Sequence, residues 1–248
     1  VGSAFGDALG GLVSVVAQTA VLTIQVPPRV LGVKMLKVHH DRAILRENGT
    51  YTVNVGDFYA EESRDVVIEV SLTDDASQAT ENGIPHLSVM LTYTDVLAKS
   101  LTQTGPVVCC ISRPHNSEVS EDNAHVAAQL LRIMSADAMA TAQQLADHDD
   151  LTAARQTLQN AIDKAQASPA AVQQDPMVQE ILQDLHVAMN GMKSTAEYSL
   201  GTTMFLSNKT QAYKQQRAAE SAAGPFAEET VYRKKSKKAM AQKFTLKK

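Results

Sequence analysis

Aromatic residues and long apolar runs are scarce in this sequence of 248 residues. Trp is absent, and Phe and Tyr bring the aromatic share to only 4%, although 44% of the residues are hydrophobic. This balance argues against a ligand pocket lined by aromatic rings and favours aliphatic, Ala-rich helical packing. Because no apolar run approaches the roughly 18 residues that a transmembrane helix needs, we predict no membrane span. The first residues also lack the basic and apolar regions of a signal peptide, although a segment before Val1 would hide one.

Cysteine is nearly absent as well, and its two copies are adjacent. Cys109 and Cys110 lie in the apolar run 107–111. One pair of neighbouring thiols makes no disulfide framework, which favours a reducing compartment and an intracellular, cytoplasmic protein. Because neighbouring side chains of a strand point to opposite faces, we expect one thiol in the core and a buried structural role rather than redox or nucleophilic chemistry. The Asn-x-Thr sequons at Asn48 and Asn208 matter only in a secreted protein, so their glycosylation stays open.

No pattern of His, Cys and carboxylates has the spacing of an active site or metal centre. His39 and His40 are adjacent at a predicted strand end, so they face opposite ways and do not share one ion. Asp147, Asp149 and Asp150 lack the roughly 12-residue spacing and the final Glu of a calcium-binding loop. We expect them to form a solvated turn that faces the positive end of the next helix. The sequence therefore predicts no enzyme activity, no catalytic or metal-ligating residue and no cofactor in this chain.

Residues 19–115 are predicted to form an antiparallel β-sandwich region. Val66, Ile68 and Val70 alternate with other residues, as along a half-buried strand, and turn signals such as the Gly83 to Pro85 segment separate the runs. Short strands with one apolar face and no interleaved helices are typical of an antiparallel sandwich. The predicted strands cover residues 19–26, 30–38, 50–55, 64–72, 86–98 and 103–112.

Residues 116–221 show the longer apolar period of helices and predict an antiparallel helical bundle, so the fold class is α+β. The first helix is expected behind Ser120 or Asp122 as its N-cap. A second helix starts at Leu151, and Asp175-Pro176 marks the start of a third. A fourth covers residues 202–219. The first helix is expected to bury the stripe Val126, Leu130, Met134, Ala138, Thr141 and Leu145, and the fourth to use Met204, Phe205 and Tyr213 as apolar contacts.

Residues 1–18 are predicted to form one amphipathic helix. Gly10 and Gly11 lie in its middle, where each costs about 1 kcal/mol relative to Ala. That cost is tolerable where a helix lies closely against a sheet, yet no sheet precedes this one and the chain begins with Val rather than Met. We therefore expect that this helix covers a sheet encoded by an earlier part of a longer protein. Its apolar stripe consists of Phe5, Leu9, Leu12, Val13 and Val16.

Three segments resemble one family. Residues 7–18 resemble the last helix of a von Willebrand factor type A domain, at the junction with a following β-rich segment. Residues 145–158 are similar to the helical hairpin that such proteins carry further on, whose second helix opens with Leu-x-x-Ala-Arg-x-x-Leu. Residues 197–217, with Glu197, Tyr198, Gly201 and Met204, resemble the end of the conserved region in members such as the plant proteins with an added RING finger. The resemblance covers roughly residues 5–218.

The resemblance implies the C-terminal half of a type A domain protein and a non-enzymatic role in protein–protein interaction or as a scaffold within a larger assembly. Type A domains bind partners through a metal-ion-dependent adhesion site with an Asp-x-Ser-x-Ser run. That run is absent here, so a divalent metal would belong to the missing type A portion. The alternative is a non-catalytic part of a ubiquitin ligase whose RING or U-box lies elsewhere.

The last segment, residues 222–248, is expected to be a basic mobile tail. Residues 211–248 carry ten Lys and Arg against three Asp and Glu, whereas residues 1–124 carry eight against fifteen. Such a cluster attracts a polyanion, either nucleic acid or an acidic protein surface, and resembles a nuclear localisation signal. A solvated tail without a dedicated partner is the other interpretation. The contact residues proposed for a polyanion or partner are Arg233, Lys234, Lys235, Lys237, Lys238 and Lys243.

Overall fold

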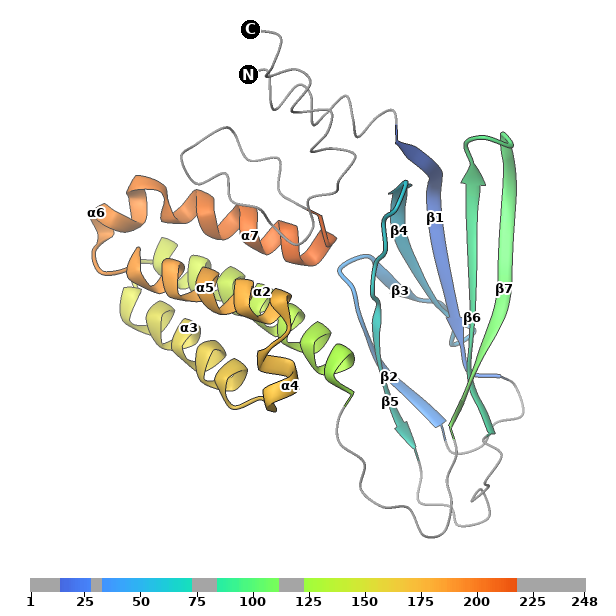
Figure 1. Ribbon diagram of the computed structural model, residues 1–248, viewed down its shortest axis with the longest axis horizontal. Coiled ribbons are helices and arrows are strands. Elements are labelled where there is room, and N and C mark those ends of the chain that lie inside the picture. Colours follow the sequence, from blue (N-terminus) through green and yellow to red (C-terminus); the bar gives the residue numbers. More distant parts are fainter. Residues whose placement is uncertain (1–13, 28–32, 73–83, 112–122, 218–248) are drawn as a thin grey trace, which may run out of the picture. The chain divides into compact units, whose positions relative to one another are not determined.

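A computed structural model describes residues 14–27, 33–72, 84–111 and 123–217 (Figure 1). The chain divides into two compact units, with a change from one to the other between residues 121 and 122. In the described residues the first unit consists of strands and their connections, and the second consists of helices. Every described strand pair is antiparallel. The predicted α+β class with antiparallel sheets is therefore confirmed.

The β unit contains two sheets. The larger has the strand order β3-β4-β1-β6-β7, and the smaller pairs β2 with β5. β1 lies at the centre of the larger sheet, while β3 and β7 form its two edges (Figure 1). The strands are β1 (Val15–Gln25), β2 (Val33–His39), β3 (Ala43–Leu45), β4 (Tyr51–Tyr59), β5 (Val67–Leu72), β6 (Ile84–Asp95) and β7 (Ser100–Ile111).

Strand β1 corrects the predicted opening helix. Residues 15–18 are extended rather than helical, because Val15 pairs with Tyr59 of β4 and Ala17 pairs with both Phe58 of β4 and Asp95 of β6. Two neighbouring strands supply hydrogen bonds that a local helical pattern does not reveal. The rest of the predicted helix, residues 1–13, lies outside the described residues. Strand β3 was missed because three residues are too few to show an alternating pattern.

Side chains from both sheets share one hydrophobic core. Ile24 of β1 and Val53 of β4 are fully buried, and Val38 of β2 is 6% exposed. Ile68 and Val70 of β5 pack against the same cluster from the smaller sheet. Alternation along the strands sends these side chains to one face. The buried members of this cluster are Ala20, Ile24, Val38, Val53, Val55 and Leu87.

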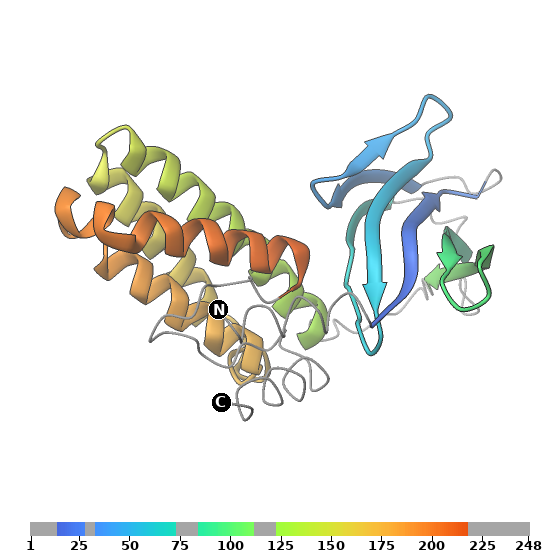
Figure 2. The same cartoon turned by 90° about the horizontal axis from the view of Figure 1, so that it is seen from above.

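The helical unit is built mainly from long helices that run alongside one another in both views (Figure 1 and Figure 2). α2 packs against α3, α5 and α7, and α3 packs against α5. The elements are α2 (Ala124–Asp147), α3 (Leu151–Gln166), α4 (Ala170–Gln173), α5 (Pro176–Asn190), α6 (Thr195–Glu197), the π-helical turn η2 (Tyr198–Thr202) and α7 (Thr203–Gln215).

Capping side chains set where these helices begin. Asp175 accepts the backbone N–H of Met177 at 2.8 Å, with Pro176 at the first helical position as predicted. The N-cap of α2 is Asn123, one residue after the later of the two predicted caps. Its side chain accepts the backbone N–H of Val126 at 3.2 Å. The predicted caps of α2, at residues 120 and 122, lie outside the described residues.

The buried face of α2 differs from the predicted one. Val126, Leu130 and Met134 are 49%, 37% and 41% exposed. Small side chains face the neighbouring helices instead, and they allow α2 to approach three helices at once. The predicted stripe is therefore wrong at its first three positions and at Thr141, which is also exposed. The residues that α2 buries are Ala128, Gln129, Leu131, Arg132, Ser135, Ala136, Met139, Ala142 and Ala146.

The entry to α7 also departs from prediction. Met204, expected as an apolar contact, is 70% exposed, and Leu206 is fully buried in its place. Tyr213 is buried and Phe205 packs against the core, as predicted. The backbone kinks at Gly201, whose φ of 155° lies in a region that favours glycine. The kink lies just before α7, and the backbone is helical again from Thr202.

Gly191 ends α5 for a steric reason. Its φ is −72°, which any residue adopts, so backbone freedom does not require glycine here. A Cβ built on Gly191 would lie 2.1 Å from Oγ1 and 2.9 Å from Cγ2 of Thr202. The Thr202 hydroxyl in turn donates to the Gly191 carbonyl at 3.2 Å. Glycine is thus needed because the start of the last helical segment lies directly against the end of α5.

We expect Gly191→Ala to lower the free energy of unfolding of the helical unit by about 1–3 kcal/mol, because the added methyl forces the chain segments apart. Chemical denaturation followed by far-UV circular dichroism measures the change. Thr202→Ala removes the opposing atoms, so the double variant should recover most of the loss that the glycine substitution causes. Equal losses in the single and double variants would show that contact with Thr202 is not the cause.

Candidate interaction surface

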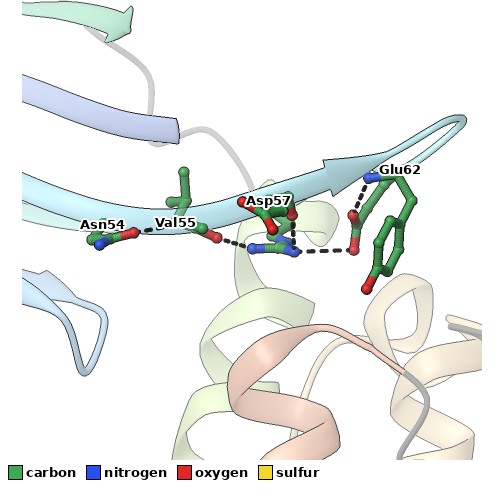
Figure 3. Close-up of polar contacts among 7 residues, drawn as sticks. Asn54, Val55, Asp57 and Glu62 are labelled. Carbon is green, nitrogen blue, oxygen red and sulfur yellow. Dashed lines mark hydrogen bonds and ion pairs between the residues drawn. The ribbon is translucent and has the colours of Figure 1, made fainter. Parts of the chain in front are cut away.

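A polar cluster of the β unit contains Asn54, Val55, Asp57 and Glu62 (Figure 3). Arg64 contacts the last three of these residues. Its guanidinium donates to the carbonyl of Val55, to the carbonyl of Asp57 at 2.8 Å and to the carboxylate of Glu62 at 3.3 Å. It also stacks over the ring of Phe58, with 4.8 Å between Cζ and the ring centroid. The side chains of Arg64 and Glu62 are 9% and 2% exposed. The cluster is a buried clamp on the end of β4.

The clamp holds a β-bulge. Ala20 of β1 pairs with Gly56 of β4, and the next pair skips to Asn54, which leaves Val55 as an extra residue. Gly56 has a φ of 76°, and its backbone N–H donates to the Asn54 side chain at 3.0 Å. Arg64 binds the carbonyls on either side of Gly56. The Arg64 guanidinium therefore stabilises the backbone of the bulge, because a bulge leaves carbonyls without hydrogen bonds from the neighbouring strand.

The histidines of the β unit are spread over separate contacts. Nε2 of His39 lies 3.3 Å from the carboxylate of Glu69 on the paired strand. Nδ1 of His40 accepts the backbone N–H of Arg42 at 3.1 Å. His86 is fully buried in β6 and accepts the backbone N–H of Ile111 at 3.3 Å. The two adjacent histidines thus contact different groups at the end of β2.

The acidic turn after α2 has structural contacts. Asp150 is the N-cap of α3 and accepts the backbone N–H of Ala153 at 2.9 Å. Asp147 accepts the hydroxyl of Tyr198 at 2.5 Å, and burial together with this carboxylate raises the pKa of Tyr198. The carboxylate of Asp150 faces the next helix start, as expected from the sequence. Asp147 instead ties α2 to η2.

A second buried polar cluster joins α2, α5 and α7. The Asp184 carboxylate accepts the Tyr213 hydroxyl at 2.5 Å and lies 2.8 Å from Nζ of Lys209. Arg132 donates to the Tyr213 carbonyl at 2.5 Å and to the Gln129 side chain at 2.7 Å. Asp184, Tyr213 and Arg132 are each 3% exposed or less. Burial raises the pKa of Asp184, and Lys209 and Tyr213 oppose that rise.

These clusters contain no arrangement typical of a metal centre. Across residues 14–27, 33–72, 84–111 and 123–217, no three His, Cys, Asp or Glu side chains lie where they could hold one ion. No helix within these ranges has the length and hydrophobicity to cross a membrane. The proposed contact residues Arg233, Lys234, Lys235, Lys237, Lys238 and Lys243 lie outside the described residues.

Strand β7 presents an exposed apolar surface. Leu101, Val107 and Val108 are 75%, 69% and 46% exposed. Cys109 and Cys110 are both exposed free thiols, so the predicted burial of one thiol is wrong. The reason is the position of β7 at the edge of the larger sheet, where its side chains are open to solvent on both faces. Sequence alternation predicts opposite faces but does not reveal whether a second layer covers either one.

The two edges of the larger sheet differ in chemistry. β3 spans three residues and is flanked by Arg42 and Arg46, two features that protect an edge from pairing with another chain. β7 spans twelve residues and contains no Asp, Glu, Lys or Arg. Within the described part of the chain, β7 pairs with β6 alone. The long uncharged edge is therefore the best candidate for a functional surface.

The chain has been compared with known proteins, and it is similar to a solved structure. No family model matches the chain, and no curated protein matches it. The solved structure is described as a von Willebrand factor type A from Catenulispora acidiphila, with 17% sequence identity and a TM-score of 0.48. The match covers 71% of this chain and 40% of that one, so it spans less than half of that protein's length.

We expect Asp184 to give the helical unit a pH-dependent stability. The pKa of Asp184 in the folded state is raised above its ordinary value of 3.8, so the folded state holds this proton more tightly than the unfolded state. The stability that the bound proton contributes is fully present below pH 3.8 and is lost as pH rises through the raised pKa. The free energy of unfolding of the wild type, minus that of Asp184→Asn, should therefore fall with rising pH. Denaturant titrations at several pH values measure it.

Asp163→Asn, which alters an exposed carboxylate on α3, controls for the general loss of one negative charge. If the difference between wild type and Asp184→Asn instead increases with pH, the Lys209 ammonium outweighs burial at this site.

Proposed function

We propose that this chain is a non-enzymatic protein–protein interaction or scaffold segment of a von Willebrand factor type A domain protein, acting within a larger assembly. In this proposal the β unit is the sandwich and the helical unit is the antiparallel bundle that follow the type A domain. The segments 145–158 and 197–217, which resemble that family in sequence, support the placement. The observation that carries the interaction role is the exposed, uncharged edge strand β7.

An edge strand of this kind suits binding by strand addition. Its outward N–H and C=O groups can pair with an extended segment, and its exposed side chains supply apolar contact. Soluble proteins usually protect such edges with charges, shortness or a covering element. β3 has the first two kinds of protection, whereas β7 is interrupted at one place, where Pro106 removes a donor and the register with β6 shifts between Thr104 and Val107. A long edge strand with a single interruption of this kind favours binding of an extended segment from a partner.

The buried charged groups support a structural rather than a catalytic role. Arg64 binds two backbone carbonyls and a carboxylate, and Asp184 binds a lysine and a tyrosine hydroxyl. Each group is held by neighbours from its own unit. Their contacts join β4 to the segment that follows it, and join α5 to α7. Each cluster therefore stabilises the unit that contains it, and the β unit is the one that carries the edge strand β7.

Two alternatives remain as separate hypotheses. The first is a non-catalytic part of a ubiquitin ligase with its RING or U-box elsewhere, which is still a binding role and differs in the partner. The second is polyanion binding through the tail, favoured by eight Lys and Arg among residues 233–248. The residues that would make this contact are Arg233, Lys234, Lys235, Lys237, Lys238 and Lys243.

We expect Val107→Lys to weaken binding of a partner to the full chain by at least about tenfold, because a lysine in the apolar contact would be buried without a counter-charge. Quantitative cross-linking in an extract of the source cells, with wild-type and variant chains as baits, measures the change.

Leu45→Lys is the matched control. It places the same new charge at a half-exposed position on the opposite edge strand, β3, so it should retain every contact that depends on β7. Equal capture by the wild-type chain and both variants would contradict an interaction role for β7.

The tail hypothesis predicts a different result. Deletion of residues 231–248 should abolish binding of the chain to a random-sequence DNA duplex, and the affinity of the intact chain should fall steeply as salt rises. Fluorescence anisotropy at several salt concentrations measures both effects. Affinity that is unchanged by the deletion would remove this hypothesis.

A further inference from the structure

We propose that the partner of β7 is the same strand of a second copy of this chain, paired antiparallel about a two-fold axis at Cys109. This inference rests on the proposed function of β7 as a binding edge and names its occupant. The two five-stranded sheets would then continue into one another across the axis. An isologous contact of this type uses one surface patch twice and closes after two chains.

The direction of the peptide groups along β7 determines which residues can pair outward. The backbone N–H of Ile111 donates to His86 of β6, so this residue faces inward. Residues of an antiparallel strand alternate between the two edges. Cys109 and Val107 therefore also face β6, while Val108 and Cys110 present their N–H and C=O groups outward. Regular pairing of β7 stops at Val107, because its register with β6 shifts between Thr104 and Val107 and Pro106 has no N–H to donate.

Only one register of the two paired β7 strands lets Val108 and Cys110 both form all of their outward backbone hydrogen bonds. With the axis at Cys109, Val108 of one copy faces Cys110 of the other, and each such pair exchanges N–H···O bonds in both directions. Moving the axis to Val108 would place Cys110 opposite Pro106, which has no N–H. Moving it to Cys110 would place Val108 opposite a residue beyond Ile111, where β7 ends. The interruption at Pro106 thus selects a five-residue contact, residues 107–111.

The side chains of this segment suit pairing with themselves. In the register at Cys109, Val107 faces Ile111 and Val108 faces Cys110, so the cross-strand contacts are apolar. No charge is present along β7, and a second copy therefore brings no like-charge repulsion. Val107 and Val108 are open to solvent in one chain, and pairing would cover both. A strand that carried even one lysine at the centre of this segment would repel its own copy.

The same register places the two Cys109 residues directly opposite each other. Such a pair without direct hydrogen bonds has its Cα atoms about 4.5 Å apart, within the range that a disulfide spans. Each Cys110 faces Val108, and the two Cys110 residues are diagonal neighbours, about 7–8 Å apart and beyond the usual disulfide range. Since the chain has two cysteines in all, cross-linking reports the register without background from other thiols.

The first experiment measures the molar mass of the purified full chain by light scattering across a dilution series, under reducing conditions. We expect a dimer that dissociates on dilution. Cys109→Lys and Cys109→Glu should each be monomeric, since each puts two like charges directly opposite one another. A mixture of the two should dimerise again, because lysine then faces glutamate. This rescue excludes misfolding as the reason for loss, and Leu45→Lys on the other edge should dimerise like the wild type.

The second experiment tests the register with the oxidant diamide, which accepts the two electrons and two protons that a pair of thiols gives up. The single-cysteine variant Cys110→Ser should form a covalent dimer, and Cys109→Ser should not. A wild-type chain that stays monomeric at every concentration, or a dimer that Cys109→Lys leaves intact, would overturn the proposal. If the chain is monomeric but still loses extract partners on Val107→Lys, self-pairing fails while the interaction role of β7 stands.

Discussion

A β-strand has hydrogen-bonding groups along both of its edges, and this requirement organises the β unit. β1 satisfies it fully, because β4 lies on one side and β6 on the other. That pairing is strong enough to keep residues 15–18 extended although their sequence also fits a helical stripe. It also tolerates a bulge at Gly56, where Arg64 takes over the carbonyls that the ladder leaves. At β7 the same requirement is met on one side by β6.

The helical unit depends on close approach between helices. α2 contacts three other helices through a face on which alanine and serine make up five of the nine buried residues, and small side chains of this kind permit close approach. Close approach brings polar groups from different helices within hydrogen-bonding distance. Arg132, Asp184 and Tyr213 form a cluster of this kind, in which each charge lies beside a compensating group. Such a cluster fixes the relative rotation of α2, α5 and α7, since a small rotation would leave a buried charge without its hydrogen bonds.

The two sheet edges show how one fold can contain both a protected and an available surface. β3 is short and has an arginine on either side, whereas β7 is long and uncharged. The cysteines in β7 therefore belong to a surface and not to a core. The sequence predicted a buried structural role for one of these thiols. Because both are exposed, any chain that pairs with β7 would contact them. The proposed roles of this edge follow from its backbone and composition, without any catalytic chemistry.

Local rules were enough for several features of this protein. Asp175 and Pro176 begin α5 because capping and the fixed φ of proline act within one turn, and alternation located the longer strands of the β unit because its period is intrinsic to an extended chain. Other features depend on residues far apart in the sequence. Val126, Leu130 and Met134 formed the most hydrophobic stripe of α2, yet packing turned the alanines inward, and nothing in their spacing identifies which face three other helices will cover. Likewise Cys109 became exposed because β7 is the last strand of its sheet, and strand order is decided by long-range pairing. Composition and period thus determined which elements form, while the tertiary structure decided which of their faces are buried, because burial depends on neighbours that the local sequence does not specify.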